Sequence, residues 1–232
     1  AHTLHNLDDL PGRVGVGHTR WATHGAPYQV NAHPHLDCSE QIAVVHNGII
    51  ENFAELKKEL EELGHVFKSK TDTEVIPHLI EEKMKRGLSF LEAVREAMNR
   101  LEGSYAIAIV SVNEPEKIFC ARKESPLVIG VAENAVYCAS DIPSFLPLTS
   151  KAVVIENGEF VILSDEGYEI RRIADWSPVS REPETVDWTF EMAEKHGYPH
   201  FMLKEIREQP PCLRNTLRLQ EQYLELMTTF LD

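Results

Sequence analysis

The hydrophobic pattern of this chain changes character at Gly103, and the change limits the folds that it can adopt. Before Gly103, apolar residues recur at three- and four-residue steps in 51–63 and 90–101, which predicts amphipathic helices after a buried strand over 41–50. After Gly103, short runs rich in β-branched residues alternate with turn residues, which predicts strands. The order favours an α/β fold of the α+β kind, with sheets packed on each other and helices outside. The predicted strands span 105–112, 117–122, 127–131, 135–139, 152–155, 160–164 and 168–173.

Local signals predict where two of the helices begin. Thr71 with Glu74, and Ser89 with Glu92, have the spacing of capping boxes, in which the two side chains satisfy backbone N–H groups of the first turn. Pro77 is expected in or near the first turn of its helix, because proline has no N–H group to donate further along. The pair Asn47-Gly48 is predicted to form a turn at the end of the first strand.

The C-terminal part follows a different pattern. Residues 176–199 contain three prolines and an acidic run with little periodicity, which predicts an extended surface arm. Residues 201–209 are expected to form a short helix that ends before Pro210-Pro211. The segment 215–232 is amphipathic and has apolar side chains available for burial.

Composition excludes several classes of function. The 232 residues include 37 acidic and 23 basic side chains, a net charge of −14, which argues against binding to nucleic-acid phosphates or to an anionic membrane surface. No apolar run approaches the length of a membrane span, and residues 1–12 do not resemble a signal peptide. The four cysteines are widely spaced, which favours a reducing, cytoplasmic location, and Cys120 and Cys138 are expected in the core.

The segment 17–25 reads Gly-His-Thr-Arg-Trp-Ala-Thr-His-Gly and is too polar for a core helix or strand. It is typical of a loop that closes over a small zwitterion. The planar guanidinium of Arg20 matches a carboxylate, although a structural salt bridge is the ordinary role of a single arginine. The neighbouring Thr23, His24 and Gly25 favour the ligand-binding role.

Two further positions suit the same ligand. Asp72 stands where acidic residues usually cap a helix, but it is also the natural anionic partner for an α-amino group whose carboxylate lies on Arg20. Asn47-Gly48 is a common turn sequence. Its side-chain and backbone N–H groups are nevertheless suited to stabilise an oxyanion, as acyl transfer requires.

The histidines raise the question of a metal. His18, His24, His33 and His35 cluster in sequence, but neither a nearby cysteine nor a carboxylate pattern completes a site around them. We therefore expect hydrogen bonding within loops for His18 and His33, contacts of a substrate loop for His24, and neither a metal nor a cofactor.

These motifs, with Asn-Ala-His-Pro-His at 31–35 and Thr-Asp-Thr-Glu at 71–74, resemble the glutaminase domain of the glutamine–fructose-6-phosphate aminotransferase family. The resemblance extends from about Gly15 to Thr216. The related phosphoribosyl and asparagine amidotransferases share the Asn-Gly and Asp-Thr-Glu elements, but they do not usually show the motifs at 19–25 and 31–35.

The resemblance implies a four-layer α/β/β/α sandwich of the N-terminal-nucleophile hydrolase type, as in class II glutamine amidotransferases. In that family an N-terminal cysteine attacks the side-chain amide of L-glutamine, with its own α-amino group as base. The ammonia passes to a sugar-isomerase domain that converts fructose 6-phosphate to glucosamine 6-phosphate. By position, Asn47 and Gly48 correspond to the oxyanion hole, and the substrate-binding residues correspond to Arg20, Trp21, Thr23, His24 and Asp72.

The chain departs from the family pattern at both ends. It begins with Ala1 and lacks the first strands of the family, so we expect an N-terminally incomplete amidotransferase domain over 1–216 that does not hydrolyse glutamine by itself. Residues 217–232 are expected to be an amphipathic tail, a possible linker to an absent isomerase domain, and a possible homodimer contact. The alternatives are a non-catalytic glutamine-binding module and another class II amidotransferase.

Overall fold

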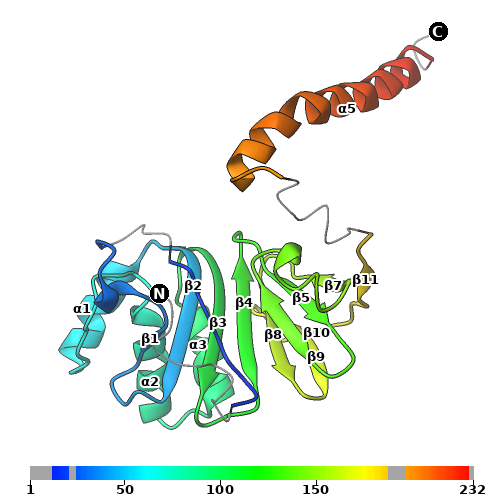
Figure 1. Ribbon diagram of the computed structural model, residues 1–232. Coiled ribbons are helices and arrows are strands. Elements are labelled where there is room, and N and C mark those ends of the chain that lie inside the picture. The colour runs from blue at the N-terminus through cyan, green and yellow to red at the C-terminus, as the bar shows by residue number, and fades with distance from the viewer. Residues whose placement is uncertain (1–11, 21–24, 188–196, 230–232) are drawn as a thin grey trace. The chain divides into compact units, whose positions relative to one another are not determined.

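A computed structural model describes residues 12–20, 25–187 and 197–229, with side chains of the last helix described as far as residue 217 (Figure 1). The chain divides into two structural units, residues 1–186 and 187–232.

Two antiparallel sheets form the framework of the first unit. The larger sheet has seven strands in the order β1-β2-β3-β4-β8-β9-β10, and the smaller has four in the order β11-β7-β5-β6. The seven strands predicted after Gly103 are all present, with ends that differ by one or two residues. The strand bounds are β1 His35–Leu36, β2 Ile42–Ile50, β3 Gly103–Ser111, β4 Ile118–Lys123, β5 Val128–Val131, β6 Val136–Ala139, β7 Lys151–Val154, β8 Glu159–Ser164, β9 Gly167–Arg172, β10 Pro178–Val179 and β11 Glu184–Thr185.

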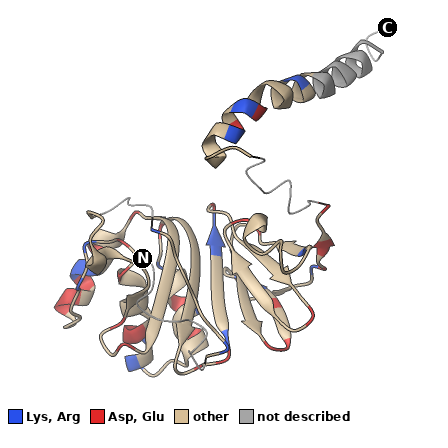
Figure 2. Ribbon diagram, viewed as in Figure 1, with Lys and Arg blue, Asp and Glu red and all other residues tan. Residues whose placement is uncertain are grey.

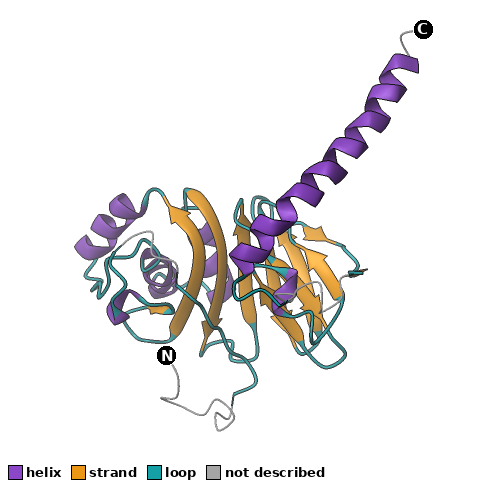
Figure 3. Ribbon diagram, turned by 45° about the horizontal axis from the view of Figure 1, so that its top comes forward, coloured by secondary structure: helices purple, strands orange, loops and turns teal. Residues whose placement is uncertain are grey.

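Three helices cover one face of the larger sheet: α1 (Phe53–Glu62), α2 (Val75–Lys85) and α3 (Phe90–Met98) (Figure 3). Their apolar faces and the strands beneath them form the main core, in which Ile76 and Ile107 are fully buried. Both signs of charge lie on α1 and α2, while the strands behind them are mostly uncharged (Figure 2). This distribution is that of amphipathic helices packed on a sheet.

A second apolar cluster fills the space between the two sheets, with Ala106 and Cys120 from the larger sheet facing Ile129 and Val153 from the smaller. The outer face of the smaller sheet is covered by Phe145, which follows the short 3-10 helix η3 (Ile142–Ser144). The first three layers of the expected α/β/β/α sandwich are therefore present in the described residues. In the position of the fourth layer, the described residues contain the short η3 segment.

The turn predicted at Asn47-Gly48 is wrong, because β2 continues through both residues to Ile50 and pairs with β3 over its whole length. Gly48 has φ +126°, and a Cβ atom there would lie 2.1 Å from the carbonyl oxygen of Ser104. Glycine at this position serves the close approach of two strands and does not reverse the chain.

Of the two predicted capping boxes, one is confirmed and one is wrong. Ser89 and Glu92 cap α3 reciprocally. At α2, the carboxylate of Glu74 instead accepts hydrogen bonds from the backbone N–H groups of Lys68 and Ser69, so it stabilises the incoming loop and does not cap the helix. Pro77 is the third residue of α2, in the first turn as expected.

The surface arm predicted over 176–199 is only partly correct. Trp176 is half-buried and packs on Phe160, with ring centroids 5.1 Å apart. The short strands β10 and β11 then pair with β9 and β7. Residues 188–196 lie outside the described residues.

The second unit contains the helix α5 (Phe201–Thr229). The helix end predicted before Pro210-Pro211 is wrong, because α5 runs through both prolines. A proline inside a helix removes a hydrogen bond and crowds the carbonyl four residues earlier, so α5 continues here against the local preference of these two residues. Every helix in the described ranges is too short or too polar to span a membrane. The domain boundary expected at residue 216 stays a prediction.

Candidate functional site

Four imidazole rings gather beside β2. His18 stacks on His33 with ring centroids 4.2 Å apart, and His33 meets the edge of His35 at 4.9 Å. The backbone N–H of His46 donates to Nδ1 of His33 at 3.2 Å, and Nδ1 of His46 lies 2.9 Å from the hydroxyl of Thr73. The cluster joins the residues before β1, the strand β2 and the segment before α2.

Burial favours the uncharged form of three of these rings, His33, His35 and His46. Burial lowers the pKa of His33 to about 3, and protonation of a neighbouring histidine or the charge of Arg20 lowers it further. Burial also lowers the pKa values of His35 and His46. Because Nδ1 of His33 accepts a hydrogen bond from a backbone N–H group, this bond requires the neutral ring. The loop hydrogen bonding predicted for His18 and His33 is confirmed.

Asp72 lies at the base of this cluster and is 3% exposed. Its Oδ2 atom accepts a hydrogen bond of 2.8 Å from the backbone N–H of Ile50, which is the only donor to this carboxylate among the described residues. The other oxygen of the carboxylate is therefore left for a further donor. Burial is the main cause that lowers the pKa of His35; Glu74 and Asp72 raise this pKa and Arg20 lowers it, so opposite charges act on the same ring.

The edge of β2 that faces away from β3 presents a row of backbone N–H groups. The hydrogen bond from Glu51 N–H to the Glu102 carbonyl (2.9 Å) fixes which residues of β2 bond to β3. By the alternation of an antiparallel ladder, the N–H groups of His46, Gly48 and Ile50 point to the opposite side. His46 donates there to His33 and Ile50 to Asp72, and the Gly48 N–H lies between these two.

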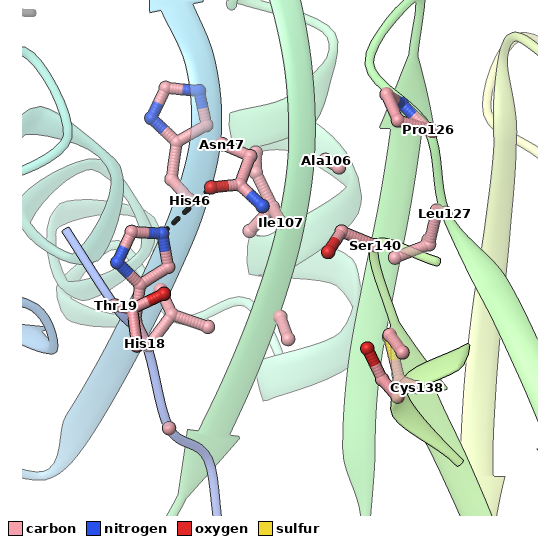
Figure 4. A pocket seen from close by; sticks show the side chains of 15 residues that line it. His18, Thr19, His46, Asn47, Ala106, Ile107, Pro126, Leu127, Cys138 and Ser140 are labelled. Atoms are coloured by element: carbon pink, nitrogen blue, oxygen red, sulfur yellow. Dashed lines mark hydrogen bonds between the residues drawn. The ribbon is translucent and has the colours of Figure 1, made fainter. Parts of the chain in front are cut away.

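Asn47 projects onto the other face of the sheet and is exposed. Its Oδ1 atom accepts a hydrogen bond of 2.8 Å from Nε2 of His18, which fixes the orientation of the amide and leaves Nδ2 directed into a pocket (Figure 4). Asn47 and Gly48 are adjacent on β2, one with its side-chain amide toward the pocket and the other with its backbone N–H at the edge of the strand.

The pocket beside Asn47 has a volume of about 270 Å³. Ala106 and Ile107 of β3 form its floor, and Leu127 and Ser140 form the wall opposite Asn47 (Figure 4). The volume is slightly below the roughly 300–1,000 Å³ that drug-sized ligands occupy, so the pocket suits a ligand as small as an amino acid.

The guanidinium of Arg20 is hydrogen-bonded to the backbone where its loop ends, at residues 25 and 26. It donates to the carbonyl oxygens of Gly25 (2.9 Å) and Ala26 (3.0 Å). Asn31, in the 3-10 helix η2 (Gln29–Asn31), donates to the same Ala26 carbonyl and accepts from the backbone N–H of Lys70. The loop is thereby linked to the segment that leads into Asp72. The other predicted residues of this loop, Trp21, Thr23 and His24, lie outside the described residues.

Sequence reasoning missed the packing roles of His46 and Thr73 and the lining role of Ser140. His46 and Thr73 lie beside Asn47 and Asp72, and only these two neighbours were given a role from the sequence. Ser140 belongs to an Ala-Ser-Asp segment that resembles the family without an assigned role.

A family profile described as the glutamine amidotransferase domain matches residues 18–147, more than half of the chain. The chain belongs to this family. The matched range contains every residue of the predicted site, from Arg20 to Asp72.

Curated relatives of this amidotransferase domain carry the name glutamine–fructose-6-phosphate aminotransferase (isomerizing). The protein of Thermococcus kodakarensis is 53% identical over 209 residues, which are 90% of this chain and 35% of the relative. The protein of Methanothermobacter thermautotrophicus is 53% identical over 214 residues, 91% of this chain and 36% of the relative. The protein of Symbiobacterium thermophilum is 54% identical over 213 residues, which are 91% of this chain and 34% of the relative. The chain thus spans about a third of the length of these proteins.

Two solved structures share the fold. One is titled as the allosteric regulatory enzyme of purine biosynthesis and matches with a TM-score of 0.59 at 29% identity, over 68% of this chain and 34% of that one. The other is the glutamine phosphoribosylpyrophosphate amidotransferase of B. subtilis, with a TM-score of 0.56, 29% identity and the same coverage. These matches confirm the N-terminal-nucleophile type of amidotransferase fold that the resemblance implies.

Proposed function

We propose that this amidotransferase domain binds L-glutamine and hydrolyses its side-chain amide for a glutamine–fructose-6-phosphate aminotransferase. A sugar-isomerase domain of the whole enzyme would then use the ammonia to convert fructose 6-phosphate to glucosamine 6-phosphate. The proposal rests on the donors along β2. The Gly48 N–H lies between the N–H groups of His46 and Ile50, which are already hydrogen-bonded, and the neighbouring amide of Asn47 is oriented by His18. The names of the relatives support the choice of acceptor.

Glutamine recognition is proposed to rest on opposite charges. Asp72 has one carboxylate oxygen bonded to Ile50 and the other left for the α-amino group of the substrate. The guanidinium of Arg20 would hold the α-carboxylate, and the loop residues Trp21, Thr23 and His24 would cover the bound molecule. Charge-assisted hydrogen bonds of this kind each contribute about 1.5–3 kcal/mol.

The oxyanion is proposed to lie against Asn47 Nδ2 and the Gly48 N–H. These donors are fixed before the reaction, one by His18 and the other by the strand itself, so they need no reorganisation when charge develops on the amide oxygen. Loss of one such donor typically lowers the turnover rate by about a hundred- to a thousandfold.

The nucleophile is proposed to be the N-terminal cysteine of an upstream segment, as in the family. A polypeptide produced with Ala1 as its first residue supplies neither that thiol nor its α-amino group. We expect this polypeptide to bind glutamine without releasing ammonia.

Two polypeptides test the proposal: one with the printed sequence, verified by intact mass, and one extended by a family segment that begins with cysteine. We expect ammonia release from the extended protein alone, and a hundred- to a thousandfold slower release when it carries Asn47→Ala. Ammonia release by the unextended protein would refute the placement of the nucleophile. Binding without hydrolysis by the extended protein would identify a non-catalytic glutamine-binding module. When the extended protein is fused to the remaining part of a curated relative, ammonia release without glucosamine 6-phosphate formation would point to another class II acceptor.

Self-association and location remain part of the proposal. Several apolar side chains of α5 are exposed, among them Met202, Ile206, Leu213 and Leu217. An exposed apolar stripe favours pairing with a second copy, so a homodimer is proposed. The wide spacing of the four cysteines supports a cytoplasmic location for the protein. Light scattering at several concentrations tests the homodimer, and a monomer at high concentration would contradict it.

A further inference from the structure

Four potential metal ligands converge at a point on the helical side of the first unit, among residues that the amidotransferase site does not use. Cys38 lies in the loop between β1 and β2, and His65 follows the end of α1. His78 and Glu81 are three residues apart on α2. One donor atom from each of these four residues lies within 4.8 Å of all the others.

The separations match those of ligands around one tetrahedral zinc ion. The Nδ1 atoms of His65 and His78 are 3.3 Å apart, and they lie 3.7 and 3.6 Å from Sγ of Cys38. Oε2 of Glu81 lies 3.1 Å from Nδ1 of His65 and 3.6 Å from Nδ1 of His78. Zinc bonds of about 2.0–2.1 Å to nitrogen and 2.3 Å to sulfur place tetrahedral ligands about 3.3 Å apart for two nitrogens and about 3.6 Å for nitrogen and sulfur.

The Nδ1 atoms of the two histidines face each other inside the cluster, and their Nε2 atoms lie on its outer side near carboxylates. Nε2 of His65 lies 3.2 Å from the carboxylate of Glu82, and Nε2 of His78 lies 3.7 Å from that of Glu74. Each Nδ1 atom also faces the carboxylate of Glu81, at 3.1 Å for His65 and 3.6 Å for His78, so this carboxylate is satisfied either by a proton on Nδ1 or by a metal ion bound to the Nδ1 lone pair. Two such nitrogens, a carboxylate oxygen and a sulfur therefore face one another, an arrangement that only a cation or an added proton makes favourable.

The surroundings also fit a metal centre. A histidine ligand that donates its second N–H to a carboxylate is the usual partner arrangement around zinc, because it fixes the tautomer and raises the basicity of the ring. The backbone N–H of Val66 donates to Sγ of Cys38 at 3.4 Å, a contact that would stabilise the thiolate that a zinc ligand supplies. Oε1 of Glu81 bonds to Lys85 at 3.0 Å, which holds this carboxylate in place.

We propose that Cys38, His65, His78 and Glu81 bind a structural zinc ion. The thiolate, two imidazoles and a carboxylate are ligands that zinc accepts in a closed tetrahedral site. His65 and His78 are buried while Cys38 is exposed, so the ion has a route of entry beside the sulfur. The sequence analysis missed the site because its ligands are spread from position 38 to position 81 with no short metal motif.

A zinc ion at this point joins three segments that otherwise meet only through side-chain packing and hydrogen bonds. These are the β1–β2 loop, the end of α1 and the first two turns of α2. The segment 71–74, which carries Asp72, leads directly into α2. The ion therefore fixes the helix that follows the proposed glutamine site, and its own presence does not depend on that site being correct.

The test measures zinc directly. The protein is purified under reducing conditions, stripped with a chelator, reloaded with zinc chloride, desalted and analysed by elemental mass spectrometry. We expect about one zinc per chain, and an affinity on the order of a hundredfold or more lower for Cys38→Ser, since changes even outside the ligand shell lower metal affinity about 10–100-fold. Cys212→Ser, an exposed cysteine of α5, is the matched control and should bind zinc as the unchanged protein does.

Cobalt(II) and thermal unfolding provide independent readouts. Cobalt bound at the site should give a thiolate-to-cobalt absorption band that Cys38→Ser lacks and Cys212→Ser retains. Zinc should raise the unfolding temperature of the unchanged protein and not that of Cys38→Ser, so a variant that folds without metal remains informative. Failure of the reloaded protein to retain zinc, or equal retention by Cys38→Ser, would overturn the proposal.

Discussion

The carboxylate of Asp72 accepts a hydrogen bond of 2.8 Å from the backbone N–H of Ile50. This contact joins the segment before α2 to the last residue of β2, and it fixes the position of a buried negative charge. The side chain thus has a structural bond on one oxygen and, in the proposed function, a substrate bond on the other. A substitution that keeps the hydrogen bond with Ile50 while weakening the bond with the substrate separates the structural role from the binding role.

Asp72→Asn is that substitution, because the asparagine oxygen still accepts from Ile50. We expect glutamine affinity to fall roughly ten- to a hundredfold, the equivalent of about 1.5–3 kcal/mol for a lost charge-assisted bond, with little change in the free energy of unfolding. Calorimetric titration with L-glutamine measures the first and urea unfolding the second. Asp175→Asn, which removes an exposed carboxylate bonded to Ser177, is the control, and an equal loss of affinity there would contradict the assignment.

Gly48→Ala should destabilise the protein more than Gly167→Ala. The two glycines have similar φ values, +126° and +119°, but a Cβ at Gly48 would lie 2.1 Å from the Ser104 carbonyl oxygen, whereas Gly167 has open space around it. The conformational strain common to both is about 1–2 kcal/mol, and the clash adds about 1–3 kcal/mol at Gly48 alone. Urea unfolding of the two variants measures the difference. Similar losses would show that β2 shifts freely at this point.

Stability should fall as pH falls below about 6.5. Burial holds the pKa of His33 at about 3, below its value of 6.5 in an unfolded chain, so the unfolded state takes up a proton first and is favoured by acid. His35 and His46 shift in the same direction. Each such histidine adds up to about 1.4 kcal/mol per pH unit to the slope of the unfolding free energy against pH. This contribution appears at pH values above 4.5, the ordinary pKa of a glutamate.

Urea unfolding between pH 7 and 4.5, with a chelator present so that metal release does not contribute, measures this slope. His33→Asn keeps an acceptor near the His46 N–H and removes the titrating ring, so it should reduce the slope. His200→Asn, at an exposed position, should leave the slope unchanged. A slope that His33→Asn does not alter would show that another group causes the acid sensitivity.

Gly130 and Phe145 should be energetically coupled. A Cβ at Gly130 would lie 2.6 Å from the Phe145 ring, so Gly130→Ala should cost about 1–3 kcal/mol of unfolding free energy through overpacking. Phe145→Leu frees space there, and the double variant should lose less than the sum of the two single losses. A double-mutant cycle by urea unfolding measures the coupling, and additive losses would argue against direct contact.

The elements that follow from local sequence were predictable, and those that depend on long-range contacts were not. The period of the apolar residues and the capping box at Ser89 predicted helices and strands to within a few residues. The same rules failed at Asn47-Gly48, because a turn signal cannot report that the Ser104 carbonyl of the neighbouring strand lies against the glycine. Glu74 failed similarly, since its hydrogen-bond donors are in the preceding loop.

The site shows the same division. Asp72 and Asn47 could be selected by residue type and setting, but the row of N–H groups on β2 is visible only once the register with β3 is known. The cluster of Cys38 with His65 could not be predicted, because 27 positions and the whole of α1 separate them. Chemistry that is assembled by topology leaves little trace in a single sequence.

The side-chain amide of Asn31 has a consequence for the chemical ageing of the protein. Its Nδ2 donates a hydrogen bond to the carbonyl oxygen of Ala26, and its Oδ1 accepts one from the backbone N–H of Lys70. Deamidation would put an acceptor where the Ala26 carbonyl needs a donor, and the resulting carboxylate would repel that carbonyl. Burial, with only 1% of the residue exposed, shields this amide from hydrolysis. The durability of the loop's attachment beside Arg20 therefore depends on how rarely a nucleophile reaches the side-chain carbonyl carbon of one buried residue.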